Sequence, residues 1–141
     1  MAVAVALVAA FAAVACQPEP KVGAPIQGVP SQAQTFGAIT QGILVPRCAT
    51  SACHAGSPPP AEPTLDAGVA WSALVAVPSL QASGTQLVEP FAPDRSYLVM
   101  KLRGTAANAG GIGTLMPPDA ALDEADIAAI EAWISNGAPN D

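Results

Sequence analysis

The residues of this chain with the most reactive side chains lie close together. Cys48 and Cys53 are two of its three cysteines, and His54, the only histidine, follows directly. Two thiols in this order can each add across a vinyl group of a haem to form a thioether, and the adjacent imidazole can then ligate the iron. The pattern predicts covalent attachment of one haem c through Cys48 and Cys53, with His54 as an axial ligand.

The spacing of the two cysteines is wider than in the usual attachment motif, where two residues separate them. Four residues lie between Cys48 and Cys53, so the chain must bulge between the two thioethers. The alternative is a Cys48–Cys53 disulfide that closes a small loop, which an oxidising compartment permits. In that case His54 is a loop histidine and the chain is a surface lipoprotein without haem, acting as an interaction module.

Met116 is the candidate for the second axial ligand of the iron. It follows a glycine-rich stretch, 104–113, and precedes two prolines that stiffen the backbone around its thioether. Met100 competes for this role, but it lies within a predicted helix. Ligation by His and Met raises the reduction potential, and a filled sixth position favours electron transfer over catalysis. If the sixth position opens instead, the chain is a haem sensor or a weak peroxidase.

The composition agrees with a small domain built around a cofactor. The chain has 141 residues, of which only 4% are aromatic, with 15 prolines and 12 glycines. So few large side chains fill a core poorly, and small loop-rich domains commonly need a disulfide, metal or cofactor. The net charge of −6 argues against nucleic-acid binding, which requires a basic surface.

The first residues predict export. Residues 1–15 form an apolar run that ends in small residues before Cys16, and the run is shorter than the roughly 20 residues of a membrane-spanning helix. We interpret 1–16 as a signal peptide with a lipoprotein cleavage site at Cys16, which becomes lipidated. The chain is then exported to the periplasm or cell surface of a bacterium and anchored to a membrane. An ordinary secretory signal with an incidental cysteine is the alternative.

Residues 17–33 predict a flexible linker, and 34–141 predict an all-α domain of about four short helices with long Pro/Gly loops. Apolar spacing predicts helices over 34–45 and 67–77, the first ended by Pro46 and Arg47. A third helix is predicted over 95–102, and a short extended piece begins at Val88. The last helix is capped by Asp123 and ends at Gly137, with Ile127, Ile130, Trp133 and Ile134 on its buried face.

This order of elements resembles a class I c-type cytochrome domain. The shared features are a first helix that leads into the cysteine–histidine motif, a glycine-rich loop with a Met-Pro step, and a terminal amphipathic helix. The resemblance implies that Cys48 and Cys53 attach the haem, and that His54 and Met116 ligate its iron. It also implies that the first and last helices pack, so that Phe36 and Ile39 meet Ile130 and Trp133.

The function that follows is that of an exported monohaem electron carrier, which meets redox partner proteins and is not an enzyme. The haem propionates need hydrogen-bond donors, and four side chains are candidates. These are Arg47, beside the first cysteine, and the aromatic residues Trp71, Tyr97 and Trp133.

Overall fold

The computed structural model describes residues 35–141. The predicted signal peptide (1–16), Cys16 and the linker (17–33) lie outside the described residues. The prediction of a small, mostly helical fold is confirmed, since the pairing between extended segments in 35–141 amounts to isolated bridges. No helix in this part of the chain has both the length and the hydropathy needed to cross a membrane.

The first helical segment runs past the position at which the sequence predicts its end. It consists of α1 (Phe36–Ile39), a π-helical turn (Thr40–Leu44) and α2 (Val45–Arg47). In a regular α-helix the Pro46 ring would collide with the carbonyl four residues earlier. Here the Val45 N–H bonds to the Thr40 carbonyl, five residues back, and this wider turn accommodates the proline. The prediction that Pro46 and Arg47 break the helix is therefore wrong.

The middle of the domain contains short helices joined by loops. These are α3 (Ala70–Leu74), a 3-10 turn (Pro93–Arg95), α4 (Tyr97–Leu102) and a second 3-10 turn (Ala106–Ala109). α3 is shorter than the predicted 67–77 because the chain becomes extended at Val75. Beyond it, Ala76 donates to the carbonyl of Val88 at 2.9 Å, and Val75 forms an isolated bridge with Val88.

The last helix, α5 (Glu124–Ser135), begins and ends as predicted. The Asp123 side chain accepts a hydrogen bond from the Asp126 N–H at 2.9 Å. Gly137 has φ +94°, a left-handed conformation that glycine adopts without strain and that ends helices. Arg103, at the end of α4, forms ion pairs with Glu124 and Glu131 of α5, so α4 and α5 are linked at the surface.

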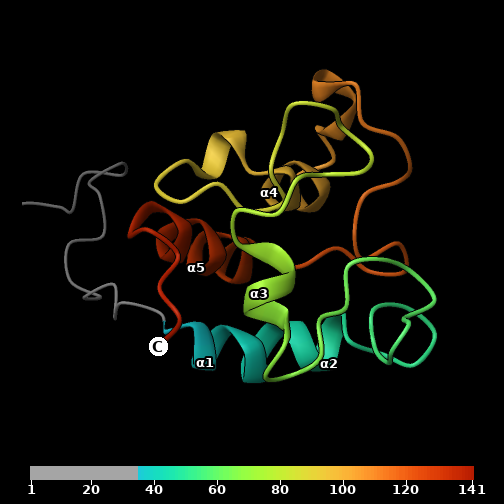
Figure 1. Ribbon diagram of the computed structural model, residues 1–141, viewed down its shortest axis with the longest axis vertical. Helices are drawn as coiled ribbons and strands as arrows, with labels where there is room; N and C mark the ends of the chain where they lie inside the picture. The colour runs from blue at the N-terminus through green and yellow to red at the C-terminus, as the bar shows by residue number, and fades with distance from the viewer. Residues whose placement is uncertain (1–34) are drawn as a thin grey trace, which may run out of the picture. The chain divides into compact units, whose positions relative to one another are not determined.

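The first and last helices pack as predicted, and the C-terminus returns to the start of α1 (Figure 1). The rings of Phe36 and Trp133 lie with their centroids 5.0 Å apart. The Gly37 N–H donates to the main-chain carbonyl of Asp141 at 3.0 Å, which fixes the chain end against α1. This core supports one side of the cavity described below.

Replacement of Trp133 by Ala tests this core. Trp133 is 1% exposed, and its removal leaves a cavity against Phe36. We expect Trp133→Ala to lower the free energy of unfolding by about 3–5 kcal/mol in urea unfolding of the purified chain. The control is Ile112→Ala, since Ile112 is 67% exposed; it should change the value by no more than about 0.5 kcal/mol. Equal effects of the two variants would contradict this description of the core.

Candidate functional site

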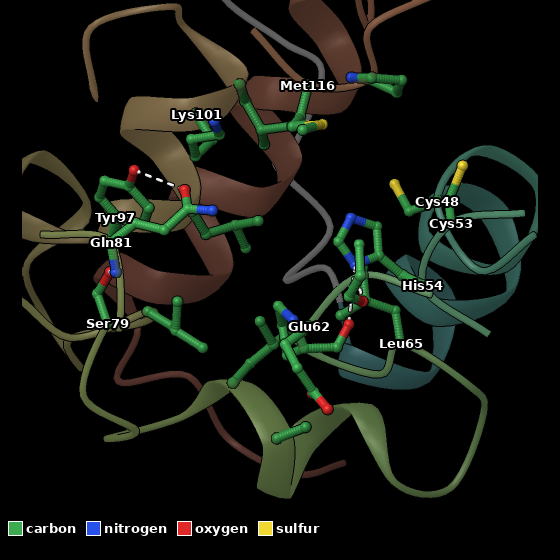
Figure 2. A pocket seen from close by; sticks show the side chains of 18 of the residues that line it. Cys48, Cys53, His54, Glu62, Leu65, Ser79, Gln81, Tyr97, Lys101 and Met116 are labelled. Carbon is green, nitrogen blue, oxygen red and sulfur yellow. Dashed lines mark hydrogen bonds between the residues drawn. The ribbon is translucent and has the colours of Figure 1, made fainter. Parts of the chain in front are cut away.

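A cavity of about 1010 Å³ opens between the cysteine–histidine turn, α3, α4 and the loop around Met116. Cys48, Cys53, His54 and Met116 all contribute to its lining (Figure 2). Much of the remaining wall is aliphatic and comes from Leu65, Leu74, Val77, Leu87, Leu98 and Leu102. Ligand cavities measure roughly 300–1,000 Å³ and are mainly apolar, so this one has the size and lining for a large flat apolar ligand.

The four residues between the cysteines form a hydrogen-bonded turn. The N–H groups of Cys53 and Ala55 both donate to the carbonyl of Thr50, at 2.9 and 3.2 Å. The His54 N–H donates to the carbonyl of Cys48 at 3.3 Å. This turn accommodates the four residues between the cysteines, and both thiols and the imidazole line one cavity.

The imidazole of His54 is held in one tautomer. Its Nδ1 lies 2.9 Å from the carbonyl oxygens of both Ala61 and Pro63. A carbonyl only accepts, so Nδ1 carries a hydrogen, and in the neutral ring the lone pair is on Nε2. Figure 2 shows the hydrogen-bonded nitrogen on one side of the ring and the other nitrogen facing the cavity. A neutral imidazole with its second nitrogen fixed in this way is the form that ligates metals.

Met116 and Met100 occupy different environments. Met116 lies in a loop, half-buried, and its N–H donates to the carbonyl of Lys101 at 3.0 Å. Met100 packs with Ala82, Tyr97 and Ala106 in a separate apolar cluster and is not among the residues that line the cavity. Of the two methionines, Met116 is the one whose thioether shares a cavity with His54.

Of the side chains predicted to meet the propionates, some bond elsewhere in the protein and others line the cavity. The indole N–H groups of Trp71 and Trp133 donate to the carbonyls of Ala138 and Pro139, each at 2.9 Å. They hold the C-terminal residues, so neither is free to bind a ligand in the cavity. Arg47 lines the cavity and donates through Nη2 to the carbonyl of Ala120 at 2.8 Å, which connects the cysteine motif to the loop after Met116.

Tyr97 and Lys101 are one turn apart on α4, and both line the cavity. Lys101 is not a site residue in the sequence-based prediction. The signal was available, because Lys101 is the only lysine beyond residue 21 and follows the apolar run 98–100. Lys101 is 8% exposed, and burial lowers the pKa of its ammonium group.

The two cysteine thiols are unbonded. Burial of Cys48 raises its pKa from 9.0 to about 11, despite the opposing effect of Arg47. A thiol with so high a pKa remains protonated near neutral pH, and it therefore reacts slowly as a nucleophile. Within residues 35–141 no three His, Cys, Asp or Glu side chains are grouped closely enough to hold a metal ion.

The raised pKa of Cys48 predicts slow alkylation of the haem-free chain. In a Cys16→Ser, Cys53→Ser background, iodoacetamide should modify folded Cys48 about 100-fold more slowly near pH 8 than the denatured chain, because a two-unit rise in pKa lowers the thiolate fraction by that factor. The rate should rise as the pH approaches about 11. Mass spectrometry of quenched samples measures it. Equal rates in folded and denatured chains would show that Cys48 is not buried in this way.

Comparison of the chain with protein-family models, with curated proteins and with solved structures finds no match. Its function must therefore be inferred from the residues of the cavity.

Proposed function

We propose that this chain is an exported monohaem c-type cytochrome that carries single electrons. Cys48 and Cys53 hold the haem through thioethers, and His54 and Met116 are its axial iron ligands. The observation that carries this proposal is that these four side chains, and no second histidine, line one apolar cavity of about 1010 Å³. The single-electron chemistry is supplied by the haem iron when it is bound.

Attachment requires no group beyond the two thiols and two vinyl groups. Each sulfur would bond to one vinyl carbon while its hydrogen went to the other carbon, so that nothing would be released. The turn between Cys48 and Cys53 holds both sulfurs at one end of the cavity (Figure 2). Since partial burial raises the pKa of Cys48 to about 11, this sulfur offers little thiolate in the folded haem-free chain, so we expect its thioether to form before folding is complete.

The protein residues around the cavity position the ligands. The carbonyls of Ala61 and Pro63 orient the His54 ring by accepting from Nδ1. The backbone bond from Met116 to α4 fixes the start of the Met-Pro-Pro segment. With His54 and Met116 both holding the iron, no position would remain for oxygen or peroxide, so electron transfer to partner proteins would be favoured over catalysis.

The proposal includes the export and anchoring predicted for the chain. The signal peptide over 1–16 and lipidation of Cys16 would place the domain on the outer side of a bacterial membrane, where c-type haems are attached and where thiols can oxidise. The linker over 17–33 would let the domain reach redox partners away from that membrane.

Redox titration tests the carrier function against the sensor and peroxidase alternatives. In haem-loaded protein we expect a one-electron titration curve, and no change of the reduced spectrum on addition of carbon monoxide, because both axial positions are filled. Binding of carbon monoxide together with turnover of hydrogen peroxide would instead favour a sensor or peroxidase with an open sixth position. A protein without haem would favour the disulfide-stabilised interaction module.

A further inference from the structure

We propose that Lys101 forms a carboxylate site at the end of the cavity away from the two cysteines, and that a haem propionate binds there. This inference rests on the proposed function, because the propionate belongs to the haem. The proposed site gives a role to Lys101 of α4, which the cysteine–histidine motif does not explain.

Lys101 is 8% exposed, and its ammonium group has no counter-ion in the part of the chain that the structure describes. Its Nζ donates to the carbonyl of Ile112 at 3.1 Å. An ammonium has three donors, so two remain for a ligand in the cavity. A buried charge without a partner is strongly unfavourable, and an anion bound beside it would offset that cost.

The Tyr97 hydroxyl lies beside the same carbonyl and completes the polar end of the cavity. It donates its one hydrogen to Oε1 of Gln81 at 3.0 Å and lies 3.5 Å from the carbonyl of Ile112, so the free donors at this end belong to Lys101. A Cβ at Gly111 would lie 2.5 Å from this hydroxyl, and one at Gly113 would lie 3.1 Å from Nζ of Lys101. Gly111 and Gly113 therefore pack against the ends of these two side chains.

The position of this site fits the substitution pattern of haem, whose two propionates lie on the edge opposite its two vinyl groups. Figure 2 shows Cys48 and Cys53 on one side of the cavity and Lys101 and Tyr97 on the other, with His54 between them. The other ionisable side chains of the lining are Arg47, Cys48, Cys53, His54, Glu62 and Asp119. Of these Arg47 adjoins the first cysteine and two are acidic, which leaves Lys101 as the cation at the far end.

Resonance Raman spectroscopy of the haem-loaded protein tests the site through the bending mode of the propionates, which reports their hydrogen bonds. In Lys101→Gln, which keeps a donor for the Ile112 carbonyl, we expect this band to shift to lower frequency and the midpoint potential to fall through loss of a positive charge. The control is Arg95→Gln, which removes the same charge from an exposed pair with Glu89 and should move neither quantity.

Each result decides between the two proposals. An unmoved propionate band in loaded Lys101→Gln overturns the carboxylate site and leaves the cytochrome function standing. If this variant does not accumulate, Lys101→Met replaces it, since it removes the ammonium group and keeps an unbranched side chain; its band should shift in the same direction, and an unmoved band again overturns the site. A wild-type protein that carries no haem overturns both proposals together.

Discussion

Replacement of His54 by Ala is expected to lower the fraction of chains that carry haem by about 10- to 100-fold, the range seen when a metal site loses a supporting interaction. His54 is the only histidine, so no second imidazole can substitute for it. Its loss also leaves the carbonyls of Ala61 and Pro63 without the N–H that bonds to both of them. Haem absorbance per mole of purified protein measures the loaded fraction.

Arg95→Gln is the matched control for this experiment, because Arg95 is an exposed residue outside the cavity. It should load haem as the wild type does under the same expression conditions. Undiminished loading of His54→Ala, with an unchanged low-spin spectrum, would mean that His54 does not ligate the iron. The interpretation of the cysteine–histidine motif would then be wrong.

Replacement of Met116 by Ala should open the sixth coordination position while the thioethers remain. We expect the six-coordinate low-spin spectrum to be lost, carbon monoxide to bind the reduced protein, and the midpoint potential to fall, since thioether ligation raises it. The structure supports this choice of ligand because Met116 lines the cavity that His54 lines. Visible spectra and redox titration of the two proteins measure these changes.

Met100→Ala is the control for that prediction, because Met100 packs in the separate cluster beside Tyr97. Its spectrum and carbon monoxide response should match the wild type, although its stability is expected to decrease through loss of buried contacts. If Met116→Ala keeps the wild-type spectrum and Met100→Ala loses it, the assignment of the sixth ligand is reversed.

Local sequence signals predicted much of the fold. The Asp123 cap and Gly137 end of α5 followed from side-chain chemistry that acts within one turn. The packing of Phe36 against Trp133 followed from the family resemblance. The errors occurred where longer-range structure prevailed: the π turn carries the first helix through Pro46, and pairing with Val88 ends α3 early.

The candidate site was predicted only as far as its reactive atoms. The motif identified Cys48, Cys53 and His54, and the position of Met116 between a glycine-rich stretch and two prolines identified Met116. The structure brings all four side chains to one cavity. The carbonyl groups that orient His54 carry no signal in the sequence, because every residue has one. The use of Trp71 and Trp133 to hold the C-terminal residues depends on contacts formed only in the folded chain.

Intact-mass spectrometry of the protein purified from a host with c-type haem maturation machinery tests covalent haem attachment. We expect a mass gain equal to one haem, which persists after acid-acetone extraction and is lost in the Cys48→Ser, Cys53→Ser variant. A colourless wild-type protein, two hydrogens lighter than the reduced chain, would contradict it. That result would indicate a Cys48–Cys53 disulfide and an interaction module in place of an electron carrier.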